Sequence, residues 1–421
     1  MADGFDLRSK AYWRRLGWGV LVGLLSAIGA FVFVALMNWG IDMVWPDPPG
    51  WEPFSGSWTI VLIMTIAGLL VGLIHRYTDA RELNVFEALD TGHMDYKPVP
   101  ASLLASLVSL VGGFSLGPEV PTGMLAAGLG TWLSKKRQLD EETAHTNVLS
   151  GVGGAYAGLF SSPLALLIMI LESTHMQTVT YYGTLFIVGL AAAVGFALFF
   201  WLSGDTFSSL LRIVQPPAYD LRVWQIGLSI LLGLLAFPIA VVFRLLVKGL
   251  RTLVAPLNKQ PILRGLIGGL LLGLLGKALP ITLFLGTAGL STTTSQAAEI
   301  GVGLLILFAL AKVLALGGAL SFGFIGGPIF PLLFVGATLG SAINLLFPQI
   351  PLGLAVGCMM AAVPAAIVPI PVALAVIVAL IVGLSPLNVV PVVLASMTSF
   401  AVVRGLSSGG SGQKKQTTTA V

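Results

Sequence analysis

The chain has 421 residues, of which 56% are hydrophobic and only 10% are charged. A typical soluble domain carries about 25% charged residues, so this composition excludes an ordinary soluble fold and indicates a protein embedded in lipid. The net charge of +4 follows from basic clusters between apolar stretches and gives no reason to expect a nucleic-acid partner.

The apolar stretches predict an all-α integral membrane protein. A helix needs about 20 apolar residues to cross the hydrocarbon core of a bilayer. Such stretches predict membrane spans at residues 16–40, 57–75, 181–203, 224–246, 262–276, 300–318 and 352–384. Shorter or interrupted stretches lie at 101–134, 147–172, 328–347 and 387–403. We therefore predict ten or more membrane-embedded helices.

Charge placement predicts the orientation of these helices. Lys and Arg gather in residues 8–15, 76–97, 135–137, 244–264 and 404–415, and the positive-inside rule places such segments in the cytoplasm. The segment 41–56 carries acidic residues without Lys or Arg, which places it outside. We expect a multi-pass protein of the cell (inner) membrane with both termini in the cytoplasm.

A repeat occurs within the chain. Residues 113–130 read GFSLGPEVPTGMLAAGLG, residues 323–340 read GFIGGPIFPLLFVGATLG, and eight of the 18 aligned positions are identical. The shared core is G-P-x-x-P followed by small residues. This predicts two inverted membrane repeats, 16–203 and 222–405, joined by an inter-repeat loop at 204–221. A cytoplasmic segment (1–15) and a flexible cytoplasmic tail (406–421) are expected at the ends, without a regulatory domain.

Each copy of the motif predicts a helix that begins inside the bilayer. A Gly-Pro pair interrupts a helix, and Pro fits the first helical turn because its missing N–H would be unbonded there anyway. A helix N-terminus presents free N–H groups and the positive end of the helix dipole. Two such ends that face each other would bind an anion without a full positive charge. The alternative is a pair of kinked packing helices whose small residues allow close approach.

Glu119 lies between the two prolines of the first copy. An acidic residue in an intramembrane break is costly and therefore points to function. Its carboxylate can occupy the anion site and, once protonated, lose its attraction for the N–H groups and swing away. Glu119 would thus act as gate, competitor of the anion and proton acceptor. The alternative is a glutamate that only caps its own helix.

These residues resemble the chloride channel/transporter (CLC) family. Gly117–Pro121 is similar to its G-[KR]-E-G-P motif, whose Glu is the external gate, and Gly327–Pro331 is similar to its G-x-F-x-P motif. Residues 151–172 resemble the stretch that leads to P-L-A-G-x-L-F-x-x-E, and Lys312 sits where members often carry Lys or Arg. The residues of these two motifs are most similar to those of a divergent bacterial branch of ion-transport proteins. The resemblance implies a CLC-like inverted repeat with broken helices, and a homodimer with one anion pathway per subunit.

Several positions depart from the family pattern. Pro118 replaces the basic residue before the gate, and Pro328 removes one N–H group from the second motif. Residues 79–84 lack the serine of the family's first motif, and no tyrosine follows residue 405. Glu172 is followed by Ser173, where exchangers often carry an internal glutamate. Glu172 itself is left as a possible part of a proton path.

The sequence therefore predicts transmembrane transport of chloride or a similar anion through a pathway gated by Glu119. Lys312 could assist electrostatically, or could instead snorkel or pair with a buried carboxylate. The alternatives are a proton-coupled anion antiporter or fluoride exporter, and an inverted-repeat transporter of another solute. The predicted anion-binding residues are Gly117, Pro118, Val120, Pro121, Gly327, Pro328, Ile329 and Phe330.

An enzyme is not expected. Ser115 lies in a G-x-S-x-G pattern, but that motif needs a strand–turn–helix setting and histidine and acidic partners. The single cysteine, Cys358, lies in an apolar stretch, and no Cys/His spacing typical of a metal site occurs. Neither a metal nor another cofactor is expected.

Overall fold

The computed structural model describes residues 8–47, 49–174, 181–204 and 213–408, and these ranges hold sixteen α-helices and no β-strand. The first eight are α1 (Lys10–Val44), α2 (Trp58–Tyr77), α3 (Val85–Thr91), α4 (Val99–Val111), α5 (Glu119–Lys136), α6 (Glu141–Leu159), α7 (Pro163–Ser173) and α8 (Tyr181–Ser203). The other eight are α9 (Val223–Val254), α10 (Pro261–Ala278), α11 (Thr287–Ser295), α12 (Ala297–Phe322), α13 (Ile329–Leu346), α14 (Leu352–Ala365), α15 (Pro371–Val382) and α16 (Val389–Ser408). The predicted all-α fold is confirmed.

Three predicted segments fall partly outside the described residues. These parts are residues 1–7 of the N-terminal segment, 205–212 of the inter-repeat loop and 409–421 of the tail.

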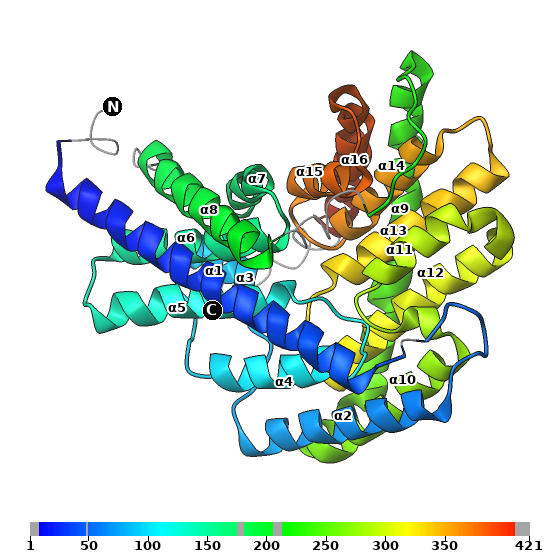
Figure 1. Cartoon of the computed structure of the whole chain (residues 1–421), viewed down its shortest axis with the longest axis horizontal. Helices are drawn as coiled ribbons and strands as arrows, with labels where there is room; N and C mark the ends of the chain where they lie inside the picture. Colours follow the sequence, from blue (N-terminus) through cyan, green and yellow to red (C-terminus); the bar gives the residue numbers. More distant parts are fainter. Residues whose placement is uncertain (1–7, 48, 175–180, 205–212, 409–421) are drawn as a thin grey trace, which may run out of the picture.

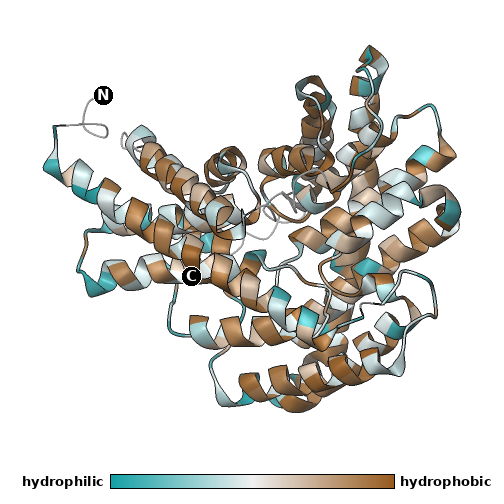
Figure 2. Cartoon of the chain, viewed as in Figure 1, coloured by the Kyte–Doolittle hydropathy of each residue, from teal (hydrophilic) through white to brown (hydrophobic). Residues whose placement is uncertain are grey.

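Eight of the described helices are long and apolar enough to cross a bilayer. Apolar side chains also cover much of their outer surface. On α1, exposed leucine, isoleucine and valine side chains recur every three or four residues, as a stripe along one face of a helix requires: Leu21, Leu25, Ile28, Val32 and Leu36. Figure 2 shows the apolar colour running along α1, α2, α8 and α10. The chain is a multi-pass membrane protein whose outer surface is suited to lipid.

The prediction of one span at 352–384 is wrong. The structure has two short helices there, α14 and α15, separated by residues 366–370. Pro371 stands at the start of α15, where its missing N–H costs nothing, and Pro369 lies in the break. Both helices are largely buried. Hydropathy alone misses this break because the turn residues are themselves apolar.

The helices of the two halves meet at equivalent positions. In Figure 1, α2 and α10, each the second helix of its half, lie side by side at the lower edge. They pack tightly at Gly68 and Gly265, where a Cβ on either residue would lie 2.2 Å from the other's carbonyl oxygen. Small residues let membrane helices pack this closely. Two related helices contact each other in this way where a two-fold axis passes between them.

The two copies of the sequence repeat meet in the same manner. Phe114 stacks on Phe324, its equivalent 210 residues later, with the ring centroids 3.7 Å apart. Gly113 and Gly323, one residue earlier in each copy, have φ angles of 88° and 85°. This left-handed conformation favours glycine and ends the preceding helix in each half. The inverted repeat of the predicted fold is therefore present at the centre of the molecule.

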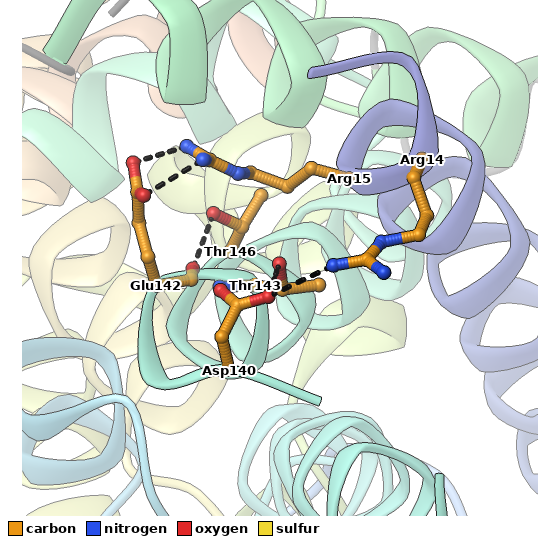
Figure 3. A network of polar contacts seen from close by, with 6 residues as sticks. All are labelled: Arg14, Arg15, Asp140, Glu142, Thr143 and Thr146. Carbon is orange, nitrogen blue, oxygen red and sulfur yellow. Dashed lines mark hydrogen bonds and ion pairs between the residues drawn. The ribbon is translucent and has the colours of Figure 1, made fainter. Parts of the chain in front are cut away.

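A polar network joins the start of α1 to the start of α6 (Figure 3). Arg15 makes two hydrogen bonds to the carboxylate of Glu142, and Arg14 lies 3.5 Å from Asp140. Asp140 caps α6, since its carboxylate accepts from the backbone N–H of Thr143 at 2.8 Å and from the Thr143 hydroxyl at 2.9 Å. Partial burial acts to raise the pKa of Asp140, but the hydrogen bonds from Thr143 and the nearby Arg15 outweigh it and lower the pKa.

We expect Asp140→Ala to destabilise the protein by about 1 kcal/mol at neutral pH, because an N-cap carboxylate is lost. A carboxyl whose pKa is lowered by folding stabilises the protein above its unfolded pKa of about 3.9, and this stabilisation is lost as the pH falls through the folded pKa. The difference in stability between wild type and Asp140→Ala should therefore be smaller in acid. Thermal unfolding in detergent at neutral and at acidic pH measures this difference, and Asp220→Ala, at an exposed residue, is the control. A difference that does not change with pH would contradict the assignment.

Candidate anion site

The site begins with a backbone contact between the two motifs. The N–H of Gly117 donates to the carbonyl oxygen of Gly327 at 2.8 Å, and the N–H of Gly327 donates to that of Gly117 at 2.7 Å. This pair is an antiparallel bridge between residues 210 positions apart. Because the two bridged segments run antiparallel, the helices that follow them leave the bridge in opposite directions. The N-termini of α5 and α13 therefore face each other across it.

The Glu119 side chain fills the space between these N-termini. It is the first residue of α5 and only 2% exposed. One carboxylate oxygen, Oε1, accepts from the backbone N–H of Ile329, the first residue of α13, at 2.6 Å. The Phe330 N–H also interacts with the carboxylate. The other oxygen, Oε2, has no hydrogen-bond partner among the described residues. A negative group is thus held by helix N–H groups without a cationic side chain.

The absence of a side chain at Gly117 and Gly327 makes room for this carboxylate. A Cβ at Gly117 would lie 2.0 Å from Glu119 Oε2, and a Cβ at Gly327 would lie 2.1 Å from Glu119 Oε1 and Cδ. Real Cβ atoms do not approach other atoms so closely. The two glycines therefore form a cradle that only a bare backbone provides.

Tyr156 of α6 supports the site together with Phe160, which directly follows α6, and Phe330 of α13. The Tyr156 hydroxyl donates to the Glu119 carbonyl oxygen at 2.5 Å. Its ring packs edge-on against Phe160, which in turn stacks on Phe330 with centroids 5.7 Å apart. Tyr156 was not among the predicted site residues. Its sequence signal is the one large polar side chain within the small-residue stretch GVGGAYAG.

A cavity of about 430 Å³, called here the vestibule, reaches Glu119 from one side. Its wall includes residues 82–86 before and within α3, and residues 367–369 between α14 and α15. Arg251 of α9 and Tyr156 of α6 line it as well. Anions could reach the helix N-termini through this space. The vestibule joins segments from both halves of the chain that no local pattern connects.

The predicted anion-binding residues have distinct places. Pro118 and Pro328 are the N-caps of α5 and α13, and neither they nor Pro121 carries an N–H group. The N–H groups of Gly117 and Gly327 are used by the bridge, so these glycines contribute space. Val120 lines the vestibule. Among the predicted residues, Val120, Ile329 and Phe330 keep N–H groups in the first turns of α5 and α13, and Glu119 adds its own N–H there.

Lys312 is completely buried and lies in α12. Its ammonium donates to the carbonyl oxygens of Thr282, Leu283 and Phe284 at 3.1, 2.9 and 2.8 Å. An ammonium has three protons, so none is left for an anion. Phe284 in turn donates its N–H to the carbonyl of Gly113, at the start of the first motif, at 3.0 Å. Any electrostatic effect of Lys312 on an anion would act at a distance.

Glu172 connects the ends of two helices. Its carboxylate accepts the N–H groups of Val372 and Ala373, in the first turn of α15, at 2.8 and 2.9 Å. It thereby joins α7 to α15, which lie next to each other in Figure 1. The half-buried Glu172 carboxylate thus has a structural role, because it caps the N-terminus of α15. Its part in a proton path stays a prediction.

Ser115 lacks the surroundings of a hydrolase nucleophile. It is 3% exposed, and in the described part of the chain its hydroxyl has no hydrogen-bond partner. His75 hydrogen-bonds to the carbonyl oxygens of Ala80 and Gly323, and His145 to that of Leu89. None of the hydrogen bonds between described residues therefore joins Ser115 to a histidine base.

Comparison with known proteins finds one family model and several relatives that match most of the chain. The family model described as voltage gated chloride channel matches residues 63–404. The "Putative ion-transport protein YfeO" of Salmonella paratyphi A is 28% identical over 347 residues, which cover 80% of this chain and 82% of the relative. The same-named protein of Salmonella typhimurium is also 28% identical, over 348 residues, with the same coverage.

Two solved structures have a similar fold. The crystal structure of a CLC-type fluoride/proton antiporter has a TM-score of 0.77 and 20% identity, and the match covers 94% of this chain and 97% of that one. The structure of a slow cyanobacterial Cl−/H+ antiporter has a TM-score of 0.74 and 19% identity, with 93% and 95% covered. At this identity the likeness concerns the fold.

Proposed function

Because the chain belongs to the voltage-gated chloride channel (CLC) family, we propose that it carries chloride or a similar small anion across the membrane through the junction of α5 and α13. Glu119 is the gate of this pathway. The anion binds where the Glu119 carboxylate now lies, and the first-turn N–H groups of both helices hold it. No enzymatic reaction is part of this function.

One observation carries the proposal: a buried carboxylate accepts the Ile329 N–H at 2.6 Å between two opposed helix N-termini. The carboxylate is itself an anion, so it stands in for a transported one. Free N–H groups and helix dipoles favour any small negative ion there. A cation site would instead gather carbonyl oxygens and several carboxylates.

Gating follows from competition for the same N–H groups. An ionised Glu119 occupies the site and excludes the anion. When Glu119 takes up a proton it loses most of its attraction for the helix ends, and its side chain can leave. The Tyr156 hydroxyl holds the backbone of Glu119 in place, so the movement is confined to the side chain.

Proton-coupled exchange of chloride or fluoride is the second candidate. Glu119 favours it, because one carboxyl group that alternates between proton and N–H groups links the two ions at one site. Coupled exchange would also need a carboxyl group that takes up protons at the inner face. The contacts of Glu172 with the N–H groups of α15 argue against that role for Glu172. An uncoupled pathway therefore remains the first choice.

The location and orientation of the protein in the membrane are inferred from the placement of its charged residues and from its family. We place the protein in the cell membrane with both termini in the cytoplasm, by the positive-inside rule. Residues 76–97 and 244–264, both basic, contribute to the vestibule, which accordingly opens to the cytoplasm. As in the family at large, two copies would form a dimer with a separate pathway in each.

Flux from liposomes tests the proposal. Purified protein is reconstituted, and efflux of chloride, fluoride and nitrate is recorded together with proton movement. Anion efflux above that of empty liposomes is expected, without stoichiometric proton movement. Tightly coupled proton movement would establish the antiporter. If no anion moves, the proposal is wrong and transport of another solute becomes the leading hypothesis.

A further inference from the structure

Three successive cations at the end of α5 each lie over an aromatic ring. The distances from the charged group to the ring centre are 6.0 Å for Lys135 and Tyr96, 4.8 Å for Lys136 and Trp132, and 5.9 Å for Arg137 and Trp18. At such distances the electron-rich face of a ring attracts a cation. Three different segments supply the rings: the stretch before α4, α5 itself and α1. We call residues 135–137 the basic patch, and Figure 2 shows the hydrophilic colour at this end of α5.

The carboxylates around the basic patch are paired with other arginines. The ion pairs between described residues are Arg14–Asp140, Arg15–Glu142 and Arg81–Asp95. The first two acids follow the patch in the chain (Figure 3), and Asp95 directly precedes Tyr96. Glu141 is exposed to solvent and takes part in none of these pairs. No direct ion pair with a described residue therefore neutralises the positive charge of the patch.

The basic patch lies where the lipid-facing surfaces of two helices end. On α1, the stripe of exposed apolar side chains begins at Leu21, three residues after Trp18 and therefore on the same face. Residues of α5 that share one face and are partly or fully exposed are Leu125, Leu129, Trp132 and Lys136. Tryptophans at the ends of membrane helices lie at the boundary between lipid and water. The cations over these indoles are thus at the depth of the lipid headgroups.

We propose that the basic patch binds the phosphate headgroup of anionic phospholipids in the adjacent leaflet, which is the cytoplasmic one in the proposed orientation. An anionic headgroup is attracted by all three charges, whereas a zwitterionic headgroup has no net charge and gains less. The acyl chains of the bound lipid lie along the apolar faces of α1 and α5. Glu119 begins the same helix at its other end, so the lipid anchors the helix that carries the gate. The inference concerns lipid binding and does not depend on transport.

The fluorescence of Trp132 reports lipid at the patch. The protein is placed in phosphatidylcholine nanodiscs in which a rising fraction of the lipid is phosphatidylglycerol with bromine near the headgroup end of its acyl chains. Bromine quenches an indole that it touches, and subtracting the signal of Trp132→Phe isolates Trp132 from the other tryptophans. Half-maximal quenching is expected at a mole fraction at least about tenfold lower than with equally brominated phosphatidylcholine.

Neutral substitutions in the patch should remove this preference stepwise. Lys136→Gln and Arg137→Gln are each expected to raise the half-quenching fraction of phosphatidylglycerol about fivefold, and not that of phosphatidylcholine. With Lys135→Gln added, the triple variant should respond to both lipids alike. Lys136→Arg keeps the charge and should behave as wild type. Lys259→Gln, the same charge change at an exposed residue after α9, is the matched control and should leave the quenching unchanged.

A second explanation is that these cations only complement the negative end of the α5 dipole. In that case the triple variant would unfold at a lower temperature, but phosphatidylglycerol and phosphatidylcholine would quench Trp132 equally in the wild type, which would overturn the proposal. A preference for phosphatidylglycerol that survives in the triple variant would overturn it as well.

The phosphate could also come from solution, and a competition experiment separates the two sources. Inorganic phosphate is added at constant ionic strength to nanodiscs that contain brominated phosphatidylglycerol. Quenching that persists at millimolar phosphate supports the lipid. Quenching that is lost would mean that a free anion occupies the patch, and the lipid proposal would be wrong. Chloride flux is not part of this test, so its result stands whether or not the protein proves to transport an anion.

Discussion

Chloride is expected to bind about tenfold more tightly to the Glu119→Gln variant than to the wild type. In the wild type an incoming anion must displace a carboxylate whose charge-assisted hydrogen bond to Ile329 is worth about 1.5–3 kcal/mol. A neutral amide in the same place makes a bond worth only about 0.5–1.5 kcal/mol. The midpoints of these ranges differ by about 1.3 kcal/mol, close to the value of about 1.4 kcal/mol that corresponds to a factor of ten. Isothermal titration of the purified protein with chloride measures it.

The pH dependence of chloride efflux is a second measurement of the role of Glu119. Wild-type efflux should rise as the pH falls, because protonation takes the carboxylate away from the helix N-termini. Glu119→Gln should transport at a rate that depends little on pH. Glu87→Gln, an exposed acid on α3, is the control and should behave as wild type. Equal chloride affinity in wild type and Glu119→Gln would mean that the carboxylate does not compete for the anion.

Gly327→Ala is expected to hold the gate open. Its Cβ would meet only atoms of the Glu119 side chain among its closest neighbours, at 2.1 Å for Oε1 and Cδ. Moving the flexible Glu119 side chain costs less free energy than moving the backbone that pairs with Gly117. The methyl group should therefore displace the carboxylate, while the hydrogen bonds between residues 117 and 327 remain. Chloride binding and flux should therefore resemble those of Glu119→Gln, although the protein keeps its fold.

A double variant tests this explanation. If Gly327→Ala acts by displacing Glu119, adding it to Glu119→Gln should change chloride affinity far less than it changes the wild type, because mutations on one contact are not additive. Gly303→Ala in α12, where an added Cβ meets nothing within 4 Å, is the control and should be silent. Full additivity of the two substitutions would show that Gly327 acts on the pathway by another route.

The membrane fold and the gate candidate were accessible from sequence because they depend on local properties of the chain. Apolar stretches need lipid or protein around them, whatever their neighbours. Gly117-Pro118 and Gly327-Pro328 interrupt helices through their own backbone chemistry. Glu119 stood out because an acid in such a break is costly. The span at 352–384 was mispredicted because its break is apolar and hydropathy does not register it.

Only the tertiary structure decided which groups meet. Gly117 and Gly327 pair across 210 residues, Glu172 caps a helix that begins 199 residues later, and the Lys312 ammonium finds three carbonyl oxygens of a loop about 30 residues earlier. Tyr156, Glu82 and Arg251 come to one vestibule from three separate segments. The sequence by itself determined the helix breaks at the two Gly-Pro motifs and the place of the acidic residue Glu119 in the first of them. Their partners depend on packing between distant segments, because a hydrogen bond or a cavity is a property of atoms brought together in space and leaves no periodic pattern in either segment alone.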